Sequence, residues 1–454
     1  MTLPIDPAPP IAVEELAHIG AGLRFMDAPT DYLQELRRRH GDTFLLDVFG
    51  FQLLMTFAPR GLQHLYELPE EQASFGLATF DLIGFKTPTE IFLDVDTELF
   101  RELLLHKRMP GYLAIMDEAV ERELRRWGDE GELEIFDAIR TLEQRTGFAL
   151  WIAPEAADDR FWPDLKRSFD VLDQAQAFVA PQLTLETIKS GKAAERAALA
   201  EIRRLLPAII AAHDRNPARQ FATVDLLRER FAGQPAEIAE RKLAHNIVNA
   251  NQGFLSNLYA AIGWVIVRLL QHPAVLARVR TEIADVRARH GTRFRHSVDA
   301  LNELRYCEQV LMESVRLGQR SLTLRKVLQP LEFDDGNRLY TVQPGVYIAT
   351  MLSVGNVQTD DLLRFDPEHY NGRELRGELL SFGKESISTF GHGRHACPAQ
   401  RFSHHMCKIV ISRLLERFEL EALFDDAQPS SRQMGGVARP QDALKMRFGR
   451  QRPD

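Results

Sequence analysis

The chain has 454 residues, 45% of them hydrophobic, and carries a formal net charge of −8. A chain of this length and apolar content can bury a large core. Charges of both signs are spread along the sequence without a basic run, which argues against nucleic acid or an anionic membrane surface as a partner.

The cysteines are few, and the N-terminal residues carry no targeting pattern. Only Cys307, Cys397 and Cys407 occur, and such an odd, sparse set is typical of a reducing compartment rather than of a disulfide scaffold. The first residues, "MTLPIDPAPPIAVEELAHIGAGL", are acidic and proline-rich, with no basic segment and no long apolar run. We therefore expect a cytoplasmic protein without a signal peptide or membrane anchor.

The first elements can be predicted from local patterns. Residues 1–24 are expected to form an extended lead-in. "TDYLQELRRRHGD" (30–42) has apolar residues at helical spacing and a glycine at its end, which predicts a helix. "TFLLDVFGFQLLMTFAP" (43–59) alternates and turns at Gly50, which predicts a hairpin.

The rest of the chain is predicted to be mainly helical. Residues 98–290 contain several long helical segments, among them the apolar stretch "LYAAIGWVIVRLL" that is expected to form a buried helix. "RLYTVQPGVYIATM" (338–351) returns to strand, and "RFSHHMCKIVISRLLERFEL" (401–420) is expected to be helical. We predict an α+β fold, mainly helical with small sheets, forming a single domain over residues 1–454.

The stretch "TFGHGRHACPAQRF" (389–402) places a lone cysteine, Cys397, on a glycine-rich turn before a predicted helix. Three roles for this cysteine are open. A zinc site needs about four ligands, and His392, His395, His404 and His405 are nearby in the sequence, but no second C-x-x-C-like pair exists. A nucleophile needs a base and an orienting acid, which a sequence cannot place. A haem-iron ligand fits because a thiolate before a helix N-terminus is stabilised by the helix dipole.

The motif resembles the haem-binding loop of the cytochrome P-450 superfamily, F-x-x-G-x-x-x-C-x-G/A. Phe390, Gly393, Cys397 and Ala399 occupy the pattern's positions. Ala399 stands where glycine is commoner, and the preceding residue is an unusual proline. The resemblance implies haem b (heme b) as cofactor, Cys397 as the iron ligand, and a fold that holds the haem between a long central helix and the cysteine loop with its following helix.

Two further motifs follow the family's order. "LMESVRLG" (311–318) resembles its E-x-x-R helix, in which Glu313 and Arg316 share one helical face and can pair. "FDPEHY" (365–370) resembles its F-x-P-x-R-F segment, with His369 in place of the usual arginine, so that the third member of the group can be neutral. The resemblance covers roughly residues 25–450.

Two basic residues are implied as partners of the haem propionates. In "LTLRKVLQP", Arg325 matches a family position that contacts a propionate, and His395 occupies the position that commonly carries arginine or histidine for the same purpose. An iron with a thiolate ligand favours cleavage of an O–O bond. The family therefore implies oxygen insertion into a C–H bond.

The predicted central helix (243–273) departs from the family pattern. The family uses an acid followed by a threonine to deliver protons, but here Ser256 and Asn257 stand at those positions, after Gly253 and the bulky Phe254. No threonine lies anywhere in the segment. An asparagine amide can donate and accept hydrogen bonds, but it does not ionise. A purely structural role for Asn257 is also possible, because buried polar side chains are usually satisfied locally.

Three functions remain open at this point. The first is a soluble monooxygenase that receives electrons from a separate ferredoxin or flavodoxin-type protein, since no flavin, nicotinamide or iron–sulfur motif is present. The second is an isomerase, dehydratase or peroxygenase acting on an oxygenated lipid, because the prostacyclin synthase and sterol 7α-hydroxylase branch, to which residues 98–120 are similar, also departs from the acid–alcohol pattern. The third is a non-catalytic haem sensor, which a distal pocket blocked by Phe254 would favour.

The substrate is expected to be a hydrophobic small molecule. Residues 78–94, "ATFDLIGFKTPTEIFLD", correspond in the family to a variable loop over the distal pocket, and they are rich in phenylalanine, isoleucine and leucine. A pocket lined in this way suits a lipid, terpenoid or sterol. Phenylalanine as plain core filler is the alternative reading.

Overall fold

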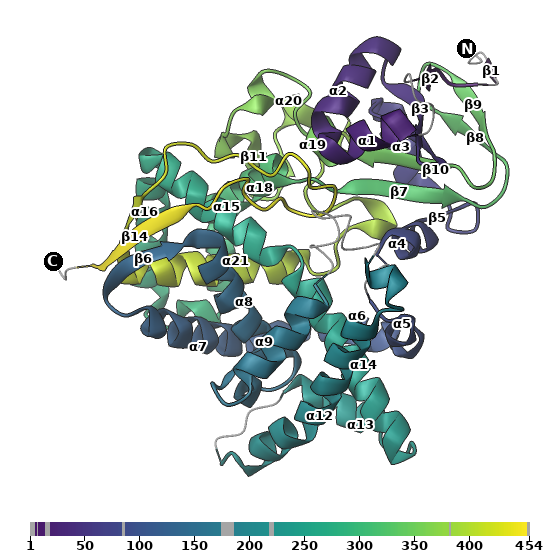
Figure 1. The fold of residues 1–454 in the computed structure, drawn as a ribbon. Coiled ribbons are helices and arrows are strands. Elements are labelled where there is room, and N and C mark those ends of the chain that lie inside the picture. The colour runs from purple at the N-terminus through teal and green to yellow at the C-terminus, as the bar shows by residue number, and fades with distance from the viewer. Residues whose placement is uncertain are drawn as a thin grey trace. The chain divides into compact units, whose positions relative to one another are not determined.

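The computed structural model of the chain describes residues 5–6, 8–13, 19–83, 87–173, 186–217, 222–380 and 383–451 (Figure 1). It is mainly helical with four small sheets among these residues, as the composition and periodicity predicted. Contacts divide the chain into two compact units, each built from distant parts of the sequence. The first comprises Met1–Gly84, Met312–Cys397 and Pro429–Gln441, and the second comprises Phe85–Leu311, Pro398–Gln428 and Asp442–Asp454.

The first unit contains most of the strands. Its largest sheet has the strand order β2-β3-β4-β10-β7-β5, a second has the order β1-β9-β8, and β11 pairs with β12. The strands are β1 Ile5–Asp6, β2 Ile11–Ala12, β3 Thr43–Val48, β4 Phe51–Thr56, β5 Ala73–Ser74, β7 Leu322–Val327, β8 Leu331–Asp334, β9 Leu339–Val342, β10 Tyr347–Met351, β11 Tyr370–Asn371 and β12 Glu374–Leu375.

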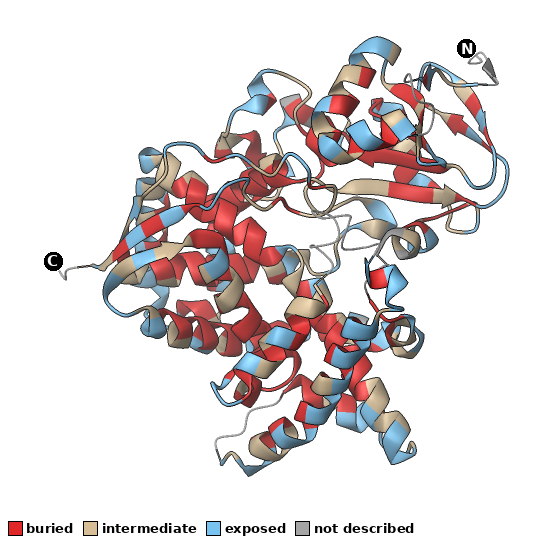
Figure 2. Cartoon of the chain, viewed as in Figure 1, coloured by how far each residue is buried: buried red, intermediate tan, exposed pale blue. Residues whose placement is uncertain are grey.

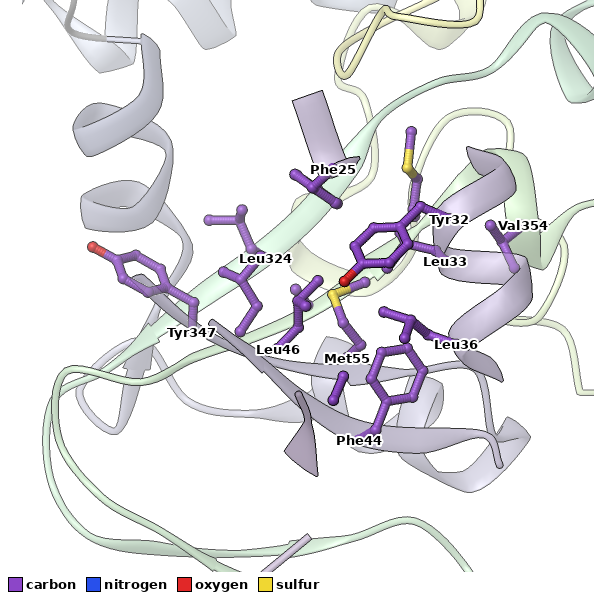
Figure 3. Close-up of a cluster of buried hydrophobic side chains, with 14 of the residues drawn as sticks. Phe25, Tyr32, Leu33, Leu36, Phe44, Leu46, Met55, Leu324, Tyr347 and Val354 are labelled. Atoms are coloured by element: carbon purple, nitrogen blue, oxygen red, sulfur yellow. The ribbon is translucent and has the colours of Figure 1, made fainter. Parts of the chain in front are cut away.

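Short helices complete the first unit. They are α1 Ile19–Asp27, α2 Pro29–His40, α3 Pro59–Glu67, α4 Phe75–Ile83, α19 Leu352–Gly355 and α20 Gly377–Leu380, with the 3-10 turns η4 Asp361–Leu363, η5 Pro367–His369 and η6 Gly393–His395. Helix α18 (Arg305–Gly318) runs from the second unit into the first. Side chains from α1, α2 and the large sheet form one core, in which Phe25, Tyr32 and Phe44 are buried (Figure 3).

Several local predictions for the first unit are confirmed. The helix ending in glycine is α2, and Gly41 after it has a φ of +87°, a conformation that favours glycine. The predicted hairpin is β3–β4, with Val48 paired to Phe51 across the turn. The prolyl-glycyl turn at 343–345 joins β9 to β10, which belong to different sheets. The extended lead-in was predicted to reach residue 24, but helix α1 begins at Ile19, so the prediction is wrong for residues 19–24. Residues of α1 pack on β3 there.

The second unit is almost entirely helical. Its helices are α5 Thr89–Asp94, α6 Thr97–Leu103, α7 Met109–Trp127, α8 Ile135–Trp151, α9 Trp162–Val171, α12 Ala193–Arg215, α13 Thr223–Arg230, α14 Ala236–Leu255, α15 Leu258–Gln271, α16 Pro273–His290, α17 Val298–Glu303 and α21 Gln400–Arg417. The 3-10 turns are η1 His106–Arg108, η2 Pro154–Ala157 and η3 Phe294–His296, and the strands β6 Glu130–Glu134, β13 Phe418–Ala422 and β14 Lys445–Arg450 form one antiparallel sheet.

Helix α8 lies at the centre of this unit. It contacts α7, α14 and α15, and most of its side chains are buried (Figure 2). Helix α15 is buried on nearly every side, which explains its continuous apolar sequence. The segment Ala236–Gln271 is long and apolar enough to span a membrane by composition, but 67% of its most apolar window is buried within the protein, as in a core helix.

The predicted central helix is interrupted. Residues 243–273 were expected to form one helix, but α14 ends at Leu255 and α15 begins at Leu258. Asn257, at the junction, has a φ of −131° and a ψ of −28°, outside helical geometry. Helical periodicity could not reveal this break, because the apolar pattern continues through it.

Candidate active site

The cysteine loop is a tight turn that depends on two glycines. Gly391 and Gly393 have φ values of +75° and +58°, in the left-handed region. A Cβ atom on Gly391 would lie 2.8 Å from the carbonyl oxygen of His395, so a larger residue would clash. The backbone N–H of Cys397 donates to the carbonyl oxygen of Phe390 at 2.6 Å. The loop thus closes on itself and leaves the Cys397 side chain partly exposed.

The residues that follow the cysteine begin the next helix. Ala399 is the N-cap residue of α21, and its carbonyl oxygen accepts from the N–H of Ser403 at 2.8 Å. An alanine side chain provides no capping hydrogen bond, so the first N–H groups of the helix have no side-chain acceptor at the N-cap. Cys397 therefore lies three residues before a helix whose N-terminal N–H groups receive no side-chain cap.

The structure gives no support to a zinc site at this cysteine. Among the described residues, no group of three or more histidine, cysteine or acidic side chains could hold a metal ion. His404 is buried in α21 with Nδ1 3.0 Å from Glu308, His392 packs against Tyr66, and Nε2 of His395 lies 2.9 Å from Glu70. A single cysteine on a glycine turn fits a prosthetic group that supplies the remaining metal ligands itself, as haem does.

The two basic residues expected near the propionates meet at one carboxylate. Arg325, on β7, is buried and donates from Nη2 to Oε1 of Glu70 at 3.2 Å, while Nε and Nη1 donate to the carbonyl oxygens of Ala73 and Leu65. Nε2 of His395 lies 2.9 Å from the same oxygen. Burial lowers the pKa of both basic groups. Sequence analysis did not identify Glu70, because nothing in "LPEEQAS" distinguishes it from the neighbouring glutamate.

Glu313 and Arg316 form a fully buried ion pair. Nε and Nη2 of Arg316 donate to the two carboxylate oxygens at 2.7 and 2.6 Å, in bidentate geometry. The guanidinium also donates to the carbonyl oxygens of Asn356, Leu362 and Arg364. Burial raises the pKa of Glu313, but the hydrogen bonds from Arg316 and His369 outweigh it, so the pKa is lowered. Such extra hydrogen bonds are what allow an ion pair to be buried.

His369 completes this group as a bridge between two carboxylates. Nδ1 lies 3.0 Å from Glu313, and Nε2 lies 3.1 Å from Asp361. The hydrogen bond to Glu313 raises the pKa of His369, which favours the protonated form. Two carboxylates therefore flank the ring, and a third member that can be neutral stays a prediction. Asp361 could not be identified from sequence, since no family motif contains it.

The residues expected on the distal side lie at the break between α14 and α15. Gly253 and Asn257 are exposed within their unit, and Ser256 is partly exposed. Nδ2 of Asn257 donates to Oγ of Ser256 at 3.1 Å. The junction thus offers an amide and a hydroxyl in contact, and neither ionises near neutral pH.

Phe254 is a core residue and does not lie with Gly253 and Asn257. It is 7% exposed and packs edge-to-face against Trp151 and Phe402. Its ring also lies where a side chain on Gly147 of α8 would be, since the nearest ring carbon is 2.9 Å from that Cβ position. The blocked pocket that favoured a haem sensor is therefore not supported, because the ring points into the helical core.

The predicted substrate loop falls in two separate elements. Its first part is α4 and its last part is α5, while residues 84–86 lie outside the described residues. Asp94, at the end of α5, accepts from Arg241 at 2.8 Å and lies 2.8 Å from Nδ1 of His245. The loop residues are therefore held by polar contacts as well as by apolar packing.

Comparisons with known proteins agree with this geometry. A family model described as Cytochrome P450 matches residues 160–448. The chain is 24% identical to a sterol 14alpha-demethylase of Mycolicibacterium vanbaalenii over 92% of this chain and 93% of that protein. It is 22% identical to cytochrome P450 7B1 of Mus musculus over 97% of this chain and 90% of that one. A solved structure of retinoic acid-bound cyanobacterial CYP120A1 has a TM-score of 0.73 at 20% identity, over 99% of this chain and 100% of that chain.

Proposed function

Because the chain belongs to the cytochrome P450 family, we propose that it oxygenates a sterol-like or terpenoid molecule. Proteins of the family bind haem, and the chain is a cytochrome P450 monooxygenase with haem iron as its cofactor. When bound, the haem supplies the iron that activates oxygen. We assign Cys397 as its ligand, with Phe390, Gly393 and Ala399 shaping the loop and Arg325 and His395 facing the propionates.

The substrate class rests on the relatives. The match to a sterol 14alpha-demethylase spans more than nine-tenths of both chains, and this observation carries the proposal. Cytochrome P450 7B1 of the mouse matches over a similar share. The apolar composition of α4 and α5 supports the same class, since hydrophobic ligands bind in apolar pockets with few polar anchors.

The electrons are proposed to come from a separate ferredoxin or flavodoxin-type protein in the cytoplasm. The sequence contains no flavin, nicotinamide or iron–sulfur motif, so this chain does not carry its own reductant domain within the 454 residues. The family implies a separate donor in general. The sparse cysteines support a reducing compartment.

Proton delivery is the point on which a second function depends. We propose that the Ser256–Asn257 junction orients water or substrate hydroxyls in place of the missing acid–threonine pair. An exposed amide at a helix break also suits the binding of a peroxide, which needs neither reductant nor a proton relay. This second function, the rearrangement or peroxygenation of an oxygenated lipid, is favoured by Asn257 alone.

The experiment compares each candidate lipid with its hydroperoxide. Purified ferric protein is incubated with matched pairs of sterols, terpenoids and fatty acids, with and without an electron-transfer system and O2, and the products are identified. We expect turnover of the parent lipids only with reductant. Asn257→Thr should then raise the product formed per electron consumed, because a hydroxyl relay is restored.

The opposite result would assign the second function. Turnover of hydroperoxides alone, without reductant, would overturn the monooxygenase proposal, and Asn257→Thr would then reduce that turnover. Cys397→Ala serves as the control in both arms, because neither chemistry is expected without the thiolate.

A further inference from the structure

Glu70 joins the two basic residues that we assign to the propionates. Its Oε1 lies 3.2 Å from Nη2 of Arg325 and 2.9 Å from Nε2 of His395. Arg325 comes from β7 and His395 from the cysteine loop, so they are distant in sequence but both belong to the first unit. One carboxylate oxygen therefore fixes the separation of the two basic side chains.

The carboxylate is itself held in place by local contacts. Oε2 accepts from Oγ of Ser74 at 2.8 Å, and both oxygens are within 3.2 Å of the backbone N–H of Phe75. The ring of Phe75 stacks on the ring of His395 at 4.5 Å between centroids and an angle of 29°. Glu70 and Phe75 thus hold His395 by its edge and by its face.

Both basic side chains keep donor capacity beyond Glu70. The guanidinium of Arg325 has five N–H groups, and its hydrogen bonds to Ala73, Leu65 and Glu70 each come from a different nitrogen. Glu70 contacts one of the two ring nitrogens of His395. The carboxylate therefore orients these groups without exhausting them.

We propose that Glu70 is the residue that positions Arg325 and His395 to bind the haem propionates. The proposal rests on the assignment of those two residues within the proposed function. It concerns retention of the cofactor and is independent of the substrate class.

A simpler role for Glu70 would be to cap α4. Its contacts with Ser74 and Phe75 lie at the N-terminus of that helix, where a carboxylate is stabilising. The two roles differ in what they affect. A cap affects thermal stability alone, whereas a positioning residue also affects how firmly the cofactor is held.

The test measures the rate at which the holoenzyme transfers haem to excess apomyoglobin. We expect Glu70→Ala to accelerate transfer about tenfold, the loss of about one charge-assisted hydrogen bond. Glu70→Gln should accelerate it less, because an amide oxygen still accepts. Ser74→Ala, which removes one of the contacts that hold the carboxylate, should accelerate it less than Glu70→Ala does. Glu71→Gln, at the exposed neighbour, should leave the rate unchanged.

Two further measurements separate positioning from capping. The midpoint potential of the iron should become more positive in Glu70→Ala and Glu70→Gln, since a negative charge near the cofactor is removed, but not in Ser74→Ala. In a His395→Phe background, the effect of Glu70→Ala on haem transfer should shrink, because the two changes act through one contact.

The proposal is overturned if Glu70→Ala lowers the melting temperature as Ser74→Ala does and leaves haem transfer and the potential unchanged. Failure of the proposed function has a different signature, since it would appear as no sterol or terpenoid turnover in a wild-type enzyme whose haem transfer still depends on Glu70.

Discussion

The buried ion pair of the first unit and the helix junction of the second unit differ in how deeply their polar side chains are buried. Glu313 and Arg316 are fully buried and each meets several partners, with the guanidinium alone contacting three carbonyl oxygens. At the junction of α14 and α15, Ser256 and Asn257 contact each other and are open to solvent within their unit. A buried, fully hydrogen-bonded network is rigid, whereas the polar side chains of the junction lie at the surface of their unit.

This difference bears on how each region tolerates substitution. A buried network fails if one member is lost, so its residue types are closely constrained. The amide and hydroxyl at the junction can be replaced at little cost to stability, so the residue types at positions 256 and 257 are less constrained. Substitutions in the two regions should therefore have effects that differ in size and also in whether stability or function changes.

The largest effect is expected from Cys397→Ala. Without the sulfur ligand, the red-shifted absorption band of the reduced, CO-bound protein should disappear entirely. Cys407→Ala is the matched control, because burial raises the pKa of the Cys407 thiol to about 12 and keeps it protonated. A retained band in Cys397→Ala would show that another residue binds the iron.

Glu313→Gln tests the rigid region directly. Removing one charge of a buried pair should lower the free energy of unfolding by about 3–5 kcal/mol, because the Arg316 guanidinium is left buried and uncompensated. Thermal unfolding of the holoenzyme and its haem content report the change. The control is Glu201→Gln, since Glu201 and Arg204 form a bidentate pair at the same spacing and similar distances on the exposed face of α12. An equal response in both variants would mean that burial does not matter here.

Phe254→Ala separates a core role from a pocket role. Phe254 is buried and packs on Trp151 and Phe402, so its truncation should lower the free energy of unfolding by about 3–5 kcal/mol. Binding of CO to the reduced protein should stay unchanged. Phe51→Ala is the control, because that ring is 53% exposed and its loss should change the melting temperature little. Faster CO binding in Phe254→Ala would instead show that the ring restricts access to the iron.

The smallest effect is expected from His369→Arg, and it should depend on pH. The folded-state pKa of His369 is raised above its ordinary value of 6.5, so its stabilising charge is fully present below pH 6.5 and is lost as the pH rises through the folded value. Arginine stays charged throughout. The melting temperature of the variant should therefore increase relative to that of the wild type as the pH rises above 6.5.

The matched control for this comparison is His290→Arg, at a partly exposed contact with Glu303. Its melting temperature should follow the wild-type pH dependence. A pH-independent difference between His369→Arg and the wild type would show that His369 does not act through its charge.

The sequence by itself determined the fold class and the cysteine-loop region. The hairpin at Gly50, the helix ended by Gly41 and the spacing of Glu313 and Arg316 are local features, set by turn chemistry and by the helical repeat. The residues around Cys397 form one short segment, so the resemblance to the haem-binding loop of the family is visible in their order alone.

Only the tertiary structure decided which distant residues meet these motifs. Glu70 reaches Arg325 across 255 positions, and Asp361 reaches His369 through a turn that no motif contains. The burial of Phe254 likewise depends on how α14 packs on α8. The break at Ser256–Asn257 was also visible only in the structure. The periodicity of a sequence predicts which segments are helical and which of their faces are apolar. It does not predict which residue is the partner across the core or where a helix ends, because packing determines both.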